Sequence, residues 1–121
     1  MPEQQSQPSL KIIERGSIRV VEFEDRKILE ELAINQIGQQ LSHLVLEADR
    51  PKLLLDFRNV QHLSSAALGM LITLNKQVSE RQGQLVLANI NAQIYEVFKI
   101  TKLNKLFNIQ DTMDGALAVF A

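Results

Sequence analysis

The residues of this chain that could do chemistry are concentrated between Asp56 and Ser65. This segment supplies a carboxylate, the imidazole of His62 and two adjacent hydroxyls at Ser64 and Ser65, so a hydrolase triad has to be considered. His62, however, is only two or three residues from the serines, no second residue is placed to orient it, and no oxyanion-hole pattern is visible. We therefore do not expect an enzyme.

Other catalytic and metal-binding patterns are missing from the sequence. No G-x-S-x-G, Walker A or G-x-G-x-x-G motif occurs, and the five glycines are scattered singly. The two histidines, His43 and His62, belong to no HExxH motif, so a metal site would need distant carboxylates. The chain has no cysteine, which excludes disulfides and thiolate metal sites and favours a reducing compartment. We expect no catalytic residue, no metal and no cofactor.

The overall charge argues against nucleic acid and membrane partners. Thirteen basic and fourteen acidic residues give a net charge of -1, without the basic excess that phosphate backbones or anionic lipids require. The longest weakly polar stretch, 66–74, is too short to span a bilayer. The first nine residues are polar and lack the features of a secretory signal. We expect a cytoplasmic protein of 121 residues, with a flexible tail over 1–9 and one domain over 10–121.

The N-terminal half of the hydrophobic pattern predicts a hairpin followed by a long helix. Short β-prone segments at 10–13 and 18–23 flank Gly16, which suits a tight turn. From 26 to 48 apolar residues recur at spacings of three and four, which indicates an amphipathic helix. We expect Asp25 to cap or charge its start. The residues expected on its buried face are Leu29, Leu32, Ala33, Ile37, Leu41, Leu44 and Val45.

The rest of the pattern alternates between strands and helices. Buried strands are expected at 52–57 and 85–88, a loop at 58–63, and a short last strand at 106–109. A second helix is expected to open at the serine pair, since Ser is an ordinary capping residue, a third helix after Asn91 as its cap, and a last helix after residue 111. Their inward residues should be Ala67, Leu68, Leu71, Ile72 and Val78, then Ile94, Val97 and Phe98, and finally Met113, Ala116, Leu117 and Phe120. The order ββαβαβαβα predicts a single α/β domain with a mixed sheet, parallel at its centre and antiparallel at its edge hairpin.

A stretch around the serine pair has no charged side chain. The 17 residues from Asn59 to Asn75 include no Asp, Glu, Lys or Arg, although 22% of the chain is charged. A buried helix explains part of this. The remainder indicates an uncharged surface, bordered by Asn59, His62 and Met70, that suits a protein partner. One phosphate on a serine there would add a charge of about -1.5 to -2, which a helix N-terminus tolerates.

The chain resembles a known family from about Leu10 to its C-terminus. The segment KLLLDFRNVQHLSSAALGMLI is similar to a strand, a short loop and the D-S-S-G-L-G helix start of the STAS-domain anti-sigma factor antagonists of bacterial partner-switching systems. A second segment, QGQLVLANINAQIYEVFKITKLNKLFNIQDTMDGAL, is similar to the family's strand, short helix, Leu/Phe strand and final helix. The resemblance implies a STAS-like fold. It also implies binding to an anti-sigma factor that is a serine kinase, which frees the sigma factor.

The resemblance further implies a phosphorylation site. Alignment on Leu68-Gly69 places Ser65 at the family's phosphorylated position, where phosphate abolishes binding and a phosphatase restores it. Ser64 then stands where the family usually has Asp, and it is the alternative acceptor. Ala66 and Ala67 replace the second Ser and the Gly. The partner-binding residues expected from the patch and the resemblance are Asp25, Asn59, His62, Ser64, Ser65, Met70 and Asn91.

These departures from the motif leave two alternatives open. The first is a STAS module that is never phosphorylated and acts as a scaffold or assembly subunit. The second is a sensor of nucleotides or other small ligands that uses the same end of the strands. Both alternatives keep the predicted fold and differ only in what the surface near Ser65 does.

Overall fold

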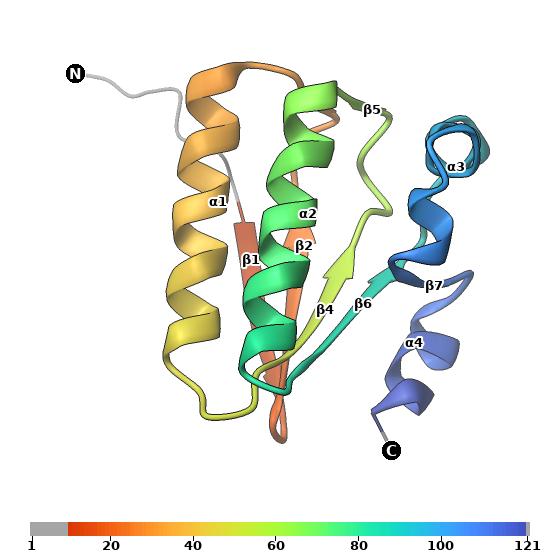
Figure 1. Cartoon of the computed structure of the whole chain (residues 1–121). Coiled ribbons are helices and arrows are strands. Elements are labelled where there is room, and N and C mark those ends of the chain that lie inside the picture. Colours follow the sequence, from red (N-terminus) through yellow and green to blue (C-terminus); the bar gives the residue numbers. More distant parts are fainter. Residues whose placement is uncertain (1–9, 121) are drawn as a thin grey trace.

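The computed structural model describes residues 10–120, which form a mixed β-sheet with helices on both faces (Figure 1). The predicted tail over 1–9 lies outside the described residues, as does Ala121. The strands are β1 (Leu10–Arg15), β2 (Ile18–Phe23), β3 (Lys27–Ile28), β4 (Lys52–Asp56), β5 (His62–Leu63), β6 (Gln84–Ala88) and β7 (Asn108–Gln110). The helices are α1 (Glu31–Leu46), α2 (Ser65–Glu80), α3 (Ala92–Ile100), the 3-10 helix η1 (Leu103–Lys105) and α4 (Met113–Val119).

Five strands form the main sheet in the order β1-β2-β4-β6-β7. Only the β1–β2 hairpin is antiparallel, and the other neighbouring strands of this sheet run parallel. The hairpin turns at Gly16, whose φ of +62° is a conformation that glycine adopts without steric cost. The predicted α/β class, with a parallel centre and an antiparallel edge hairpin, is confirmed.

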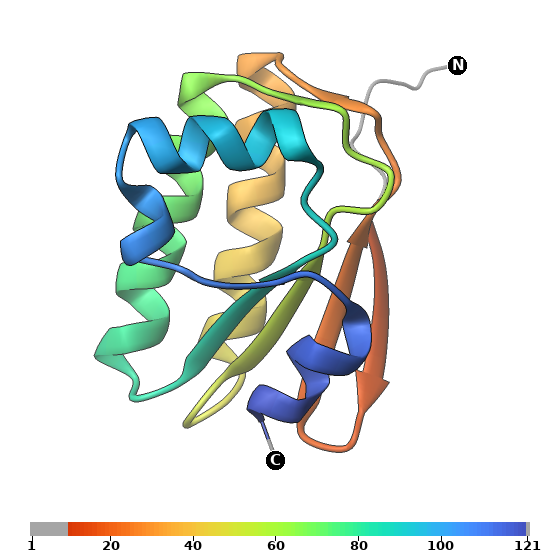
Figure 2. The same ribbon diagram turned by 90° about the vertical axis from the view of Figure 1, so that its right-hand side faces the viewer.

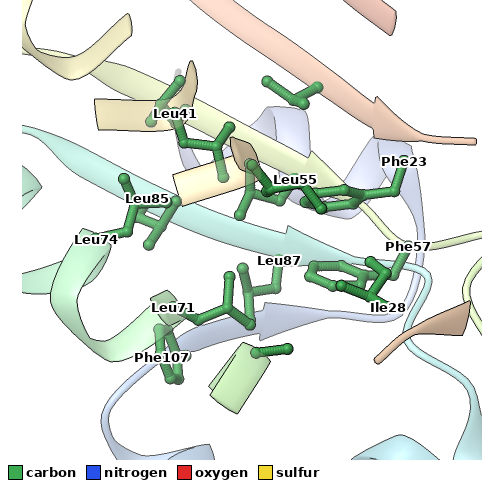
Figure 3. Close-up of a cluster of buried hydrophobic side chains, with 14 of the residues drawn as sticks. Phe23, Ile28, Leu41, Leu55, Phe57, Leu71, Leu74, Leu85, Leu87 and Phe107 are labelled. Carbon is green, nitrogen blue, oxygen red and sulfur yellow. The ribbon is translucent and has the colours of Figure 1, made fainter. Parts of the chain in front are cut away.

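The central strands are buried on both faces, as their unbroken apolar runs predict. Leu53 and Leu55 of β4 face the main core beneath α1 and α2, and Leu54 between them faces a smaller core beneath α4. Figure 3 shows Leu55 and Leu87 of the sheet packed in the main core. Figure 2 shows α4 on the side of the sheet opposite α1 and α2. The sheet therefore separates two cores of unequal size.

The predicted first helix starts too early, because its first residues form a strand instead. Lys27 and Ile28 make the short strand β3, which pairs in parallel with His62 and Leu63 of β5. The same pairing places β5 inside the segment 58–63 that was predicted as a loop. Each of these strands has only two residues, too few to show a period of two in the sequence. The observed element order therefore contains two strands more than predicted.

The capping residue and two of the buried side chains predicted at the start of this helix are also wrong. Asp25 does not cap α1, whose N-cap position is held by Glu30 without a side-chain cap hydrogen bond. Leu29 and Leu32, which were expected to be buried, are 48% and 62% exposed. Because the helix begins at Glu31, Ile34 is buried in the core, where the spacing had predicted Leu32 and Ala33.

Three smaller predictions need correction. Ile72 of α2 and Val97 of α3 are exposed, although helical spacing placed them on buried faces. The last strand runs from Asn108 to Gln110, and η1 occupies the residues just before it. Leu106 is consequently exposed, and Phe107 fills the core position.

Candidate functional site

The two serines at the start of α2 have different roles in the fold. Ser64 is the N-cap residue, and its Oγ accepts a hydrogen bond from the backbone N–H of Ala67 at 3.2 Å. Its side chain is partly buried. Ser65 is the first helical residue and is exposed. The cap therefore occupies the hydroxyl of Ser64, whereas Ser65 lies on the surface.

The β3–β5 pair holds the start of α2 in place. The backbone N–H of Ser64 donates to the carbonyl of Ile28 at 3.2 Å, and the N–H of Gln61 donates to the carbonyl of Arg26 at 2.7 Å. These bonds join the entry to α2 to the entry to α1. The small sheet missed by the sequence prediction thus positions the serine pair.

Two asparagines fix the loop between β4 and β5. Asn59 Nδ2 donates to Glu22 Oε2 at 3.0 Å and to the carbonyl of Phe23 at 3.2 Å. Asn91 Nδ2 donates to the carbonyl of Val60 at 3.2 Å, while its Oδ1 accepts from the N–H of Ile94 at 2.8 Å and caps α3. The capping role predicted for Asn91 is confirmed. Both amides are used within the fold, so they shape the loop that precedes the serines.

Asp56 is a buried carboxylate that the sequence did not single out beyond the triad test. It is 1% exposed and ends β4. Its Oδ1 accepts from the N–H of Arg58 at 3.0 Å and from Asn89 Nδ2 at 2.9 Å, and its Oδ2 pairs with Arg58 Nε at 2.8 Å. With both oxygens engaged, this carboxylate organises the ends of β4 and β6.

The remaining predicted residues do not all lie on one surface. His62 is exposed on β5, directly before the serines. Met70 is five residues after Ser65, which places it about 140° around the helix. It faces α1, because a Cβ on Gly38 would lie 3.1 Å from Met70 Cγ. Asp25 is partly buried between β2 and β3. The structure thus groups His62, Ser64 and Ser65 and places Met70 on another side of α2.

The surface beside Ser65 is uncharged over more than two turns of α2. Gly69 and Ile72, at four and seven residues from Ser65, share its side of the helix, and both are exposed. The first charged residue on this side is Lys76. Within residues 10–120, no group of three acidic or histidine side chains is placed to hold a metal ion. Among the same residues, no helix is long and apolar enough to cross a membrane.

The fold is a small α/β domain with a mixed sheet and helices on both faces. Its most distinctive surface is the start of α2, where the serine pair follows the central strand. The chain belongs to the STAS domain family, whose model matches residues 12–116. It is 29% identical, over 85 residues, to the putative anti-sigma factor antagonist BtrV of Bordetella bronchiseptica. That match covers 70% of this chain and 72% of BtrV.

Solved structures show the same fold. A STAS-domain anti-sigma-factor antagonist from Planctomyces limnophilus superposes with a TM-score of 0.82 at 21% identity, covering 93% of this chain and 97% of that one. The Bacillus cell fate determinant SpoIIAA in its phosphorylated form superposes with a TM-score of 0.70 at 16% identity, covering 94% of this chain and 99% of SpoIIAA. At these identities the likeness concerns the fold alone.

Proposed function

We propose that this protein is an anti-sigma factor antagonist whose surface around Ser65 binds an anti-sigma factor with serine kinase activity. Binding releases the sigma factor that the anti-sigma factor holds. Phosphorylation of Ser65 ends the binding, and a phosphatase restores it. In this role the chain is a regulator in the bacterial cytoplasm and catalyses no reaction itself.

The main support for the proposal is that the two serines differ in structure: Ser64 caps α2 and Ser65 is exposed. The hydroxyl of Ser64 accepts the capping hydrogen bond of α2, so phosphorylation of Ser64 would disturb the helix start. Ser65 is exposed one residue later, within a surface that has no charge until Lys76. The membership of the chain in the STAS family and its likeness to BtrV support the role of antagonist. Ser65 is therefore the better acceptor of the two.

A phosphate on Ser65 would act locally. In the transfer, Ser65 Oγ bonds to the γ-phosphorus of ATP held by the kinase, the bond to ADP breaks, and the hydroxyl proton passes to a base of the kinase. The first turn of α2 has free N–H groups and a favourable dipole for the dianion, so the fold is kept. A partner that packs on the uncharged surface would have to bury about two negative charges, which strongly weakens binding.

The test measures binding to an anti-sigma factor kinase from the source organism of this protein. We expect Ser65→Ala to bind as the wild type does and Ser65→Glu to bind at least about tenfold more weakly, because a buried charge opposes the contact. Ser79→Glu is the matched control, since it adds the same charge to an exposed position at the other end of α2. Equal binding by Ser65→Glu and Ser65→Ala would contradict the switch.

The site itself is identified by mass spectrometry after incubation with the kinase and ATP. Phosphate is expected on Ser65, and phosphate found only on Ser64 would show that the alternative acceptor is used. The scaffold alternative draws on Ser64 and Ala67, which stand where the family usually has Asp and Gly. A single band on phosphate-affinity gels under all growth conditions would favour that alternative.

A further inference from the structure

The outer face of the two long helices has no charged side chain over most of its length. In α1 no Asp, Glu, Lys or Arg occurs from Leu32 to Leu46, and in the loop and helix around α2 none occurs from Asn59 to Asn75. The two helices lie side by side in front of the sheet (Figure 1), joined by a hydrogen bond from Ser42 Oγ to Gln77 Oε1 at 2.8 Å. In a chain that is 22% charged, exposed helix positions normally carry most of the charge.

A groove of about 470 Å³ runs between α1 and α2 on this face. Gly38 lines it from α1 and Met70 lines it from α2, close enough that a Cβ on Gly38 would lie 3.1 Å from Met70 Cγ. The residues that line it include Asn35, Gly38, Ser42, Leu46, Met70 and Thr73, and His43 is the only ionisable group among all the lining residues. His43 pairs with Glu47 at the end of α1, at 3.2 Å. The groove is thus a neutral surface of mixed polarity.

Helix α1 has a second stripe besides the one that packs into the core. The inner stripe includes Ile34, Ile37 and Leu41. The outer stripe repeats at alternating spacings of three and four, which is the spacing of the contact seam in a coiled coil. Its residues are Leu32, Asn35, Gln39, Ser42 and Leu46. The two leucines at its ends are 62% and 65% exposed, so this seam has apolar ends that the domain itself leaves uncovered.

We propose that a second copy of this chain covers the outer face, with the two α1 helices antiparallel and a two-fold axis beside Gln39. Leu32 and Leu46 each lie seven residues from Gln39, roughly 10 Å along the helix. Antiparallel pairing about that residue places Leu32 of one copy against Leu46 of the other, so both exposed leucines are buried. Asn35 and Gln39 lie near the centre, where amide hydrogen bonds between helices fix the register.

The symmetry of the exposed stripe on α1 favours a second copy over a different protein, because the exposed Leu32 and Leu46 lie at equal distances on either side of Gln39. Across a two-fold axis each side chain near the axis meets its own copy, so any charge there meets a like charge. Asn35 and Gln39, which lie near the proposed axis, carry no charge and so meet this restriction. The proposed dimer uses no contact of Ser65 and is independent of the proposed anti-sigma factor binding.

The first test is sedimentation velocity across a wide range of protein concentration. The wild type is expected to show a monomer–dimer equilibrium. Leu46→Glu should raise the dimer dissociation constant about a hundredfold or more, because each copy loses a buried leucine and must bury a carboxylate. Ile100→Glu is the matched control, since Ile100 is 77% exposed on α3 and lies outside the face. A wild type that stays monomeric, or a dimer that Ile100→Glu disrupts instead, would overturn the proposal.

The second test locates the axis. The chain has no cysteine, so Gln39→Cys introduces a single thiol, which should form a disulfide-linked dimer faster than Ile100→Cys under mild oxidation. Gln39→Lys and Gln39→Glu should each be monomeric, because like charges meet at the axis, and an equimolar mixture should recover dimers. No recovery in the mixture, or equal cross-linking at both positions, would rule out this axis. If Leu46→Glu weakens anti-sigma factor binding in a monomeric protein, the face belongs to that partner instead.

Discussion

At the residue scale, the adjacent Ser64 and Ser65 have different structural roles at the start of α2. The backbone of Ser64 is extended, with φ -87° and ψ 168°, so its hydroxyl turns back to the N–H of Ala67. Ser65 already has helical geometry, and its side chain points away from the core. Helix capping therefore decides which of the two serine hydroxyls is left exposed.

The two serines should also differ in their effect on stability. Ser64→Ala is expected to lower the free energy of unfolding by about 1 kcal/mol, because it leaves the N–H of Ala67 without its cap. Ser65→Ala should change it by only a few tenths of a kcal/mol, as exposed positions usually do. Urea denaturation of the two variants measures the difference. Equal losses would mean that Ser64 does not cap the helix in solution.

At the element scale, the sequence predicted those elements that carry a strong local signal. The strands β4 and β6 are long apolar runs between breakers, and α2 has both a capping serine and a regular apolar spacing, so all three were found nearly complete. The strands β3 and β5 were missed because two residues carry no period, and only the fold brings them together. Their absence from the prediction also displaced the start of α1.

The local features of the candidate site were predictable from the sequence, whereas its tertiary contacts were not. The cap rule located the helix start at the serine pair, and Asn91 was recognised as a cap for the same reason. That Met70 lies on another side of α2 than Ser65 follows from their five-residue separation, whereas its contact with Gly38 depends on where α1 packs beside α2 and was not predictable. The tertiary bonds of Asn59 to Glu22 and Phe23 join residues that are far apart in sequence, and a single sequence contains no sign of them.

The connection from α2 to β6 depends on the absence of one side chain. A Cβ on Gly83 would clash with the carbonyl oxygen of Pro51, which also accepts the N–H of Gln84. Gly83→Ala should therefore lower the free energy of unfolding by about 1 to 3 kcal/mol, since backbone must move. Gly69→Ala is the control, because nothing lies within 4 Å of its added Cβ and alanine is a better helix former.

Thermal and urea unfolding of the two glycine variants separate these effects. Gly69→Ala is expected to be as stable as the wild type or more stable by up to about 1 kcal/mol. Gly83→Ala should unfold at lower urea concentration with an unchanged dependence on urea. If Gly83→Ala matches the wild type, the close approach of Pro51 is not a constraint on this turn.

At the scale of the whole molecule, the two faces of the sheet are covered unequally. The main core lies under α1 and α2, extends to α3 and η1, and contains most of the buried apolar side chains of residues 10–120. The opposite core is built from Val20, Leu54, Val86, Ala88, Ala116 and Phe120. Among the described residues, only α4, of seven residues, covers that face. The sheet thus has one thick and one thin layer.

This asymmetry predicts that α4 opens independently of the rest of the domain. Its amides should exchange with deuterium at least about tenfold faster than those of β4, because releasing α4 exposes only Ala116, Phe120 and their few partners. Helix α2 is the control, since it is also helical but packs on the main core. Small additions of urea should accelerate exchange in β4 and α2 more than in α4, because local opening exposes less surface than global unfolding. Exchange of α4 at the rate of β4 would show instead that the thin layer and the thick layer unfold as one unit.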